Sequence, residues 1–143
     1  MMQTGRWRSD GVRVVRAGAL EDARRESAGR ATAFDFTGTG GHKTWIGTVS
    51  LQAGQMTGPH HHGRHEVALY VVKGRSEIRW GERLEFSAEV GAGDFVYFAP
   101  FVPHQEFNPD AVAPVDFLVV RSDGEKIAVG LALSPVAAPE KVF

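Results

Sequence analysis

Residues 54–66 read GQMTGPHHHGRHE, and this stretch holds four of the six histidines in the chain. Side chains alternate between the two faces of a β-strand, so His60 and His62 would project to one face and His61 to the other. Two imidazoles on one face can bind the same transition-metal ion, and a carboxylate such as Glu66 can add a ligand and neutralising charge. Without further support, however, a His-x-His pair is more typical of a solvated loop.

A second segment, residues 93–108, strengthens the metal-site interpretation. It begins with Gly93, continues through an apolar run and ends with His104 and Asn108. In this order, the two segments resemble the two motifs of the cupin family, G-x5-H-x-H-x3-or-4-E-x6-G and G-x5-P-x-G-x2-H-x3-N. The matching residues are Gly54, His60, His62, Glu66, Gly93, His104 and Asn108.

The resemblance implies both a fold and a ligand set. It implies an all-β, double-stranded β-helix (jelly-roll) cupin barrel with an N-terminal extension. It also implies that His60, His62, Glu66 and His104 bind one divalent transition-metal ion, which can be Fe, Mn, Zn or Ni. A small-molecule substrate or ligand and a homodimer are the partners that the resemblance implies.

The first motif departs from the family pattern after Glu66. Seven residues separate Glu66 from Gly74, where the motif has six, so counting back from Gly74 puts Val67 in the place of the carboxylate. The spacing from His62 favours Glu66, and a β-bulge after Glu66 would absorb the extra residue. A site made of three histidines is the alternative.

The second motif departs at its proline and glycine, which are Ala99 and Phe101 here. Phe101 is bulky where the family has glycine. Two interpretations stay open for it. The ring either narrows the mouth of the pocket or packs outside it.

The rest of the chain fits an all-β domain. Seventeen glycines and seven prolines separate short runs rich in β-branched and aromatic residues, which is typical of a sandwich or barrel of many short strands. We expect one domain over residues 1–143, with an extension at 1–43, the barrel at 44–133 and a tail at 134–143. The one predicted helix is Leu20–Ser27. The predicted strands are Val12–Arg16, Ala31–Phe36, Thr44–Gln52, Val67–Lys73, Ser76–Trp80, Leu84–Glu89, Phe95–Phe98, His104–Asn108, Val115–Arg121 and Ile127–Leu133.

Composition excludes several classes of protein. The chain has no cysteine, which rules out disulfides and thiol catalysis and suits a cytoplasmic protein. A net charge of −1 argues against a nucleic-acid binder, which usually carries a basic excess. No signal peptide or membrane-spanning run is evident, so we expect no membrane partner. The strand predicted at Val12–Arg16 is a candidate for pairing with a second chain in a homodimer.

Three functions remain open for such a site. The favoured one is an oxygenase-like enzyme, because three imidazoles and a carboxylate leave coordination positions open. The others are a metal-dependent isomerase, epimerase or decarboxylase, and a binding protein without chemistry. Glu106 has the same strand parity as His104, so it is the candidate catalytic residue, as a general base or an orienting group. A solvated position at the rim is the other interpretation of Glu106.

Overall fold

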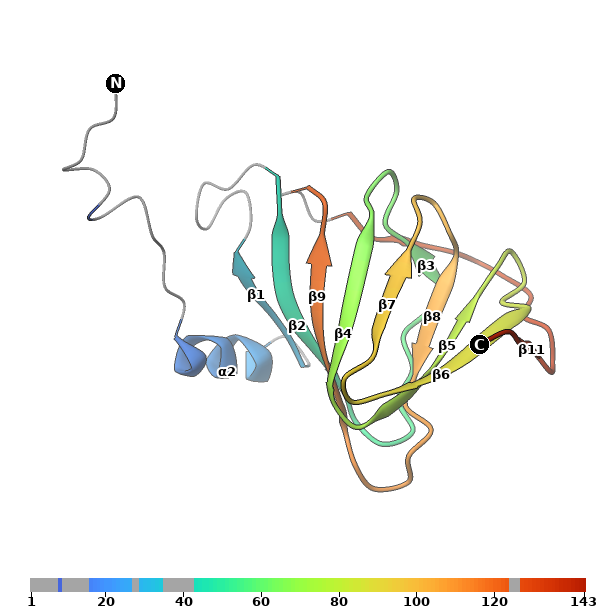
Figure 1. The fold of residues 1–143 in the computed structure, drawn as a ribbon, viewed down its shortest axis with the longest axis horizontal. Coiled ribbons are helices and arrows are strands. Elements are labelled where there is room, and N and C mark those ends of the chain that lie inside the picture. The colour runs from blue at the N-terminus through green and yellow to red at the C-terminus, as the bar shows by residue number, and fades with distance from the viewer. Residues whose placement is uncertain (1–7, 9–15, 27–28, 35–42, 124–126) are drawn as a thin grey trace.

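The computed structural model describes residues 8, 16–26, 29–34, 43–123 and 127–143, and it is built from two β-sheets that face each other (Figure 1). The elements are α2 (Ala17–Glu26), β1 (Arg30–Phe34), β2 (Trp45–Leu51), β3 (His60–His61), β4 (Val67–Lys73), β5 (Arg75–Trp80), β6 (Phe86–Gly91), β7 (Phe95–Phe98), β8 (His104–Phe107), β9 (Val115–Arg121), β10 (Val129–Gly130) and β11 (Glu140–Lys141). The all-β class predicted from the sequence is confirmed.

The order of the strands within the sheets is that of a jelly roll. One sheet runs β1-β2-β9-β4-β7 and the other runs β10-β3-β8-β5-β6-β11. Strands that are far apart in the chain are therefore neighbours, as where β9 pairs antiparallel with both β2 and β4. This arrangement matters for the site, because it brings β3 from the first motif next to β8 from the second.

Most of the predicted elements are present, with shifted ends. The strands at β4, β7 and β9 have the predicted bounds, whereas the strand expected at Ile127–Leu133 shortens to β10. The helix begins earlier than predicted, at Ala17. Two short strands, β3 and β11, were not predicted, because two residues give no readable alternation. Residues 12–15, 27 and 35–36 of the predicted elements lie outside the described part of the chain.

The core follows from the alternation of side chains along the central strands. In β9, Val115, Phe117, Val119 and Arg121 are buried, and the residues between them are partly exposed. Most of the buried hydrophobic side chains form one cluster between the two sheets. Its members are Trp45, Leu51, Val67, Leu69, Val71, Ile78, Phe98, Val115, Phe117 and Val119. One end of this cluster forms the floor beneath the candidate site.

Residues that the motifs share with cupins close turns in this framework. Gly74 joins β4 to β5 at a φ of 84°, and a Cβ atom there would lie 2.4 Å from the carbonyl oxygen of Pro114, so only glycine fits. Asn108 is fully buried, and its amide donates to the carbonyl oxygens of Leu51 and Ala113. Gly74 and Asn108 therefore stabilise the fold and take no part in the candidate site.

Phe101 occupies the left-handed region of backbone conformation, with a φ of 63°. This is the position where the cupin motif has glycine, and a side chain there costs about 1–2 kcal/mol. The ring is 61% exposed and lies edge-on to His61, with 5.7 Å between ring centroids. The backbone therefore keeps the conformation of the family glycine, and the ring sits on the outside rather than in the core.

Replacing Phe101 with glycine should stabilise the fold by about 1 kcal/mol, because glycine adopts this φ without strain and little buried surface is lost. The melting temperature should rise by about 2–5 °C. Val112→Gly is the matched control, since Val112 is 86% exposed at an ordinary φ. That variant should melt at or below the wild-type temperature. A Phe101→Gly protein that melts below wild type would show that the ring contributes more than the strain costs.

Candidate metal site

Three imidazoles meet where the two motif segments lie side by side. His60 on β3 pairs directly with His104 on β8 across the sheet, and His62 follows two residues later on the same face as His60. Ring centroids are 4.9 Å apart for His60 and His62, 4.3 Å for His60 and His104, and 5.1 Å for His62 and His104. One nitrogen from each ring lies within 4.8 Å of the others, so the group could hold a metal ion.

Backbone carbonyls fix which nitrogen of each ring is available. Nδ1 of His60 lies 2.7 Å from the Gly58 carbonyl oxygen, Nδ1 of His62 lies 2.8 Å from that of Ile127, and Nδ1 of His104 lies 3.0 Å from that of Val102. A carbonyl only accepts, so each Nδ1 carries the proton and each Nε2 keeps its lone pair in the neutral ring. Metal-ligating histidines typically have such a second hydrogen bond.

Burial keeps two of these rings neutral. His62 and His104 are 7% and 1% exposed. Loss of solvation lowers the pKa of His62 to about 3 and also lowers the pKa of His104. The Nε2 atom of His104 is buried and has no hydrogen-bond partner. A buried nitrogen lone pair without a hydrogen-bond partner suits a metal ligand, so these residues fit a bound metal.

The structure does not bring Glu66 to this cluster, contrary to the expectation from its spacing. Glu66 is exposed, and its carboxylate accepts a hydrogen bond from the hydroxyl of Tyr97 at 2.6 Å. Val67, the next residue, is 2% exposed and faces the imidazoles. The reason is strand parity. The irregularity in β4 lies between Val71 and Lys73, at the far end of the strand, so it cannot turn Glu66 inward.

A different carboxylate, that of Glu106, lies beside the imidazoles. Glu106 is 8% exposed, and its Oε1 atom lies 3.7 Å from Nε2 of His104. The hydroxyl of Thr57 donates to Oε2 of Glu106 at 2.9 Å and so fixes the orientation of the carboxylate. Strand parity predicted that Glu106 could face inward, and the structure places it there rather than at the rim. No sequence pattern indicated Thr57.

The other histidines near the motif play no part in the group. His61 points away, and its Nδ1 accepts a hydrogen bond from the Gly63 amide at 2.9 Å. His65 is buried, with Nε2 3.9 Å from the carboxylate of Asp123. The alternation of strand residues therefore separates His61 from its two neighbours as expected.

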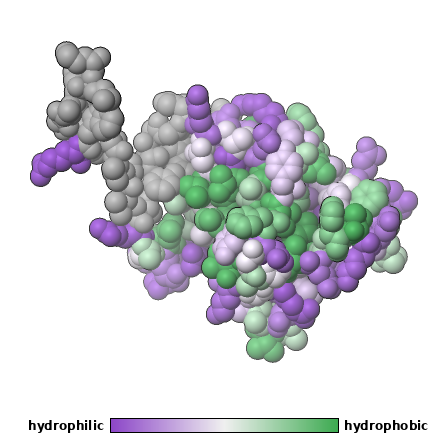
Figure 2. Space-filling view, viewed as in Figure 1, coloured by the Kyte–Doolittle hydropathy of each residue, from purple (hydrophilic) through white to green (hydrophobic). Residues whose placement is uncertain are grey.

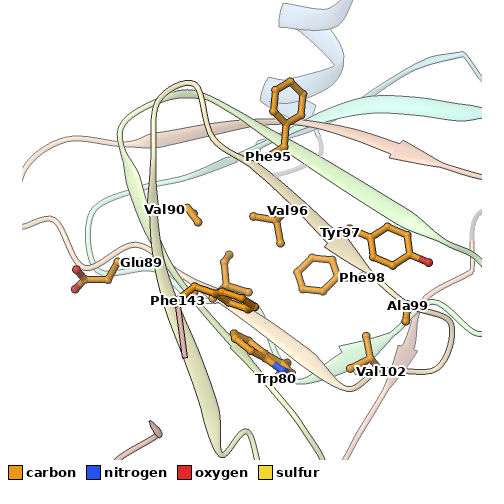
Figure 3. Close-up of a pocket in the computed structure, with 12 residues that line it drawn as sticks. Trp80, Glu89, Val90, Phe95, Val96, Tyr97, Phe98, Ala99, Val102 and Phe143 are labelled. Atoms are coloured by element: carbon orange, nitrogen blue, oxygen red, sulfur yellow. The ribbon is translucent and has the colours of Figure 1, made fainter. Parts of the chain in front are cut away.

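Two kinds of cavity lie near the imidazoles, one apolar and one polar. A hollow of about 530 Å³ opens between β7 and the β5–β6 hairpin, and Figure 3 shows Val96, Phe98 and Trp80 around it, with Phe143 beside Trp80. Hydrophobic side chains also gather over the middle of the face in Figure 2, while hydrophilic ones dominate its rim. Phe98 stacks on His104 at 3.8 Å, so it forms a wall between this apolar hollow and the imidazoles.

The second cavity contains the polar groups. A small internal space of about 30 Å³ is lined by His60, His62, Glu106 and Arg121 among others. It continues into a hollow of about 250 Å³ that His60 and His62 also line. A molecule that reacts at the imidazoles would therefore bind in this smaller polar cavity, although the apolar hollow is larger.

Sequence reasoning missed Arg121, which lies at the end of β9. Its side chain is 3% exposed, and its Cζ atom lies 4.4 Å from the centroid of the Trp45 ring. The signal was present in the sequence, since Arg121 continues the inward series of Val115, Phe117 and Val119 in the predicted strand.

Acidification should destabilise the metal-free protein. The unfolded chain takes up a proton at His62 below about pH 6.5, whereas the folded state does so only near pH 3. Protons therefore favour the unfolded state, and stability is lost as the pH falls from 6.5 toward 3. At pH 5, His62 alone should cost about 2 kcal/mol relative to pH 7, and the lowered pKa of His104 acts in the same direction.

Urea unfolding of metal-free protein at pH 7 and pH 5 measures this loss. The His62→Gln variant is the control, and it should lose less stability over the same interval. Equal losses in the variant and the wild type would contradict the assignment.

In the described part of the chain, no helix has the length and hydrophobicity of a membrane span.

Comparison with known proteins agrees with the geometry. A family model described as a cupin domain matches residues 47–121. No curated protein sequence gives a significant match.

Solved structures share the fold at low sequence identity. One is an uncharacterised conserved protein with a double-stranded β-helix domain from Klebsiella pneumoniae, with 18% identity, a TM-score of 0.65, and coverage of 85% of this chain and 99% of that chain. Another is the polyketide cyclase RemF from Streptomyces resistomycificus, with 23% identity, a TM-score of 0.61, and coverage of 73% and 71%. Oxalate decarboxylase from Bacillus subtilis shows 21% identity and a TM-score of 0.63 over 71% of this chain and 27% of that chain.

The matched residues 47–121 include all three imidazoles of the candidate site and make up more than half of the chain. The chain therefore belongs to the cupin domain family.

Proposed function

We propose that the protein is a mononuclear metalloenzyme that acts on a small organic molecule. The metal ligands are His60, His62 and His104, each through Nε2. The observation that carries this proposal is the set of three Nδ1 hydrogen bonds to backbone carbonyls, which leaves three Nε2 lone pairs free in a group whose candidate ligand atoms lie within 4.8 Å of one another. A binding protein without a metal would have no need for that arrangement.

Three ligands leave coordination positions open, which is the mark of a catalytic rather than a structural metal site. A divalent iron ion held there would supply oxygen chemistry, whereas zinc, manganese or nickel would supply Lewis-acid chemistry. The protein itself contributes position and exclusion of water, since the imidazoles lie in a largely buried cavity. Glu106 serves as the proton acceptor at the site, because its carboxylate lies beside His104 and Thr57 fixes it.

Oxygenase activity is the first candidate. Iron(II)-loaded protein should be mixed with each member of a panel of diketones, phenols, thiols and organic acids. An oxygen electrode should record oxygen consumption with at least one class of these compounds. The His104→Ala protein, treated in the same way, should consume none. A broad panel without any oxygen consumption by the wild-type protein would contradict the oxygenase assignment.

Decarboxylation or isomerisation is the second candidate, and Glu106 is the observation in its favour. Such reactions need a group that moves a proton and no oxidant. A structure with the same fold is an oxalate decarboxylase, although only the fold is shared at this identity. Product formation under anaerobic conditions, lost in Glu106→Gln but with bound metal retained, would select this candidate over the first.

A further inference from the structure

Arg121 is a buried cation with unsatisfied hydrogen-bond donors. It is 3% exposed, and its Nε and Nη1 atoms are buried without any hydrogen-bond acceptor. Among the residues that the structure describes, no carboxylate forms an ion pair with it. Burying a guanidinium without a counter-ion is costly, and such groups are usually paired or functional.

The contact with Trp45 does not replace the missing acceptors. The Trp45 ring lies against the guanidinium, with 4.4 Å from Cζ to the ring centroid. A cation–π contact of this kind stabilises the positive charge, but it leaves the N–H donors free. Trp45 thus holds the guanidinium in place while its donors stay available.

The cavity beside Arg121 is the one that contains the imidazoles. Arg121 lines the internal space together with His60, His62 and Glu106. Its volume of about 30 Å³ exceeds the roughly 10–15 Å³ that one water needs. A group the size of a carboxylate fits there, while the rest of a small molecule can extend into the adjoining hollow of about 250 Å³.

A second positive charge faces the same space. Arg30 on β1 lines both the internal cavity and the adjoining hollow. Burial, and after it repulsion from Arg30, lowers the pKa of Arg121 to about 10 against an opposing attraction from Glu106, and this pKa still leaves Arg121 charged at neutral pH. An anion between the two guanidinium groups would relieve both the repulsion and the missing hydrogen bonds.

We propose that Arg121 binds the carboxylate of the substrate, so that the substrates of this protein are small organic acids. The acid enters through the hollow beside Arg30, and its carboxylate accepts hydrogen bonds from Arg121 while the rest of the molecule faces the three imidazoles. This inference rests on the proposed function and narrows its substrate class. It gives Arg121 a binding role and leaves proton transfer to Glu106.

Calorimetric titration tests the proposal with two probes, glycolate and its neutral analogue glycolamide. Metal-free and zinc-loaded wild-type protein should both bind glycolate more tightly than glycolamide. Arg121→Gln should weaken glycolate binding by about tenfold or more, in line with the loss of a charged hydrogen bond, and should weaken glycolamide binding less, because the neutral amide lacks the charge. Arg83→Gln, at an exposed arginine on the surface, is the matched control and should bind as wild type does.

The role of Arg121 in binding can be tested separately from metal binding by the imidazoles. Metal content, measured by elemental analysis, reports on the imidazoles and should be the same in Arg121→Gln and wild type. A preference for glycolate that appears only with zinc would show that the metal rather than Arg121 holds the carboxylate, and would overturn the proposal. Equal binding of both probes by metal-free wild type would overturn it too, even if the variant does not fold.

Discussion

Replacing His104 with alanine should abolish metal binding. His104 is 1% exposed, it lies opposite His60 on the neighbouring strand, and its Nε2 has no hydrogen-bond partner. Two imidazoles alone do not complete a stable site, so the metal content measured by elemental analysis should fall to background. His60→Ala should have the same effect, because His60 supplies the facing nitrogen.

The control for this prediction is His61→Ala. His61 is adjacent to both first-motif ligands, but its Nδ1 is bonded to the Gly63 amide and its ring lies against Phe101. That variant should retain the wild-type metal content. Circular dichroism should show β-structure in all three variants, because the strands do not depend on the ion. Metal retained in the His104 variant would exclude this residue as a ligand.

Truncation of Phe117 should have the largest effect on stability. Phe117 is 1% exposed at the centre of β9, packs in the core cluster and also lines the small internal cavity. Changing a buried phenylalanine to alanine costs about 3–5 kcal/mol through lost burial and the cavity left behind. Since domains of this size are stable by only about 5–15 kcal/mol, much of the fold's stability would be lost.

Phe95→Ala is the matched control, because Phe95 is the same residue type at 77% exposure on β7. Its ring lies beside that of Tyr70, with 4.7 Å between ring centroids, and most of its surface is exposed, so its loss should cost less than about 1 kcal/mol. Urea unfolding of both variants measures the difference. Equal losses would mean that the core does not lie where the two sheets face each other.

The fold was predictable from local patterns. Val115, Phe117 and Val119 alternate with less apolar neighbours, and the two motif segments set the order of the elements around them. The two-residue strands β3 and β11 were not predictable, since pairing with β8, β10 and β6 defines them and the sequence gives no local sign of it.

The site was predictable in part. The three histidines could be predicted from the spacing of the two motifs, whereas the position of the Glu66 carboxylate depended on where β4 begins. A difference of one position keeps Glu66 away from the imidazoles, because Val67 rather than Glu66 faces inward at the start of the strand. Thr57 comes to the site only through the folding of distant strands, so no spacing along the chain pointed to it. Arg121 could have been predicted to face inward from the alternation along β9, but its place beside the imidazoles depends on the fold.

The metal content of wild-type protein tests the central claim most directly. Protein should be purified, stripped with a chelator, reloaded in turn with iron(II), manganese, zinc and nickel, freed of excess ion and examined by elemental analysis. We expect one ion per chain for at least one of these metals, and we expect it to be lost on replacement of His104. Wild-type protein that retains no metal after expression and after reloading with all four would contradict the account.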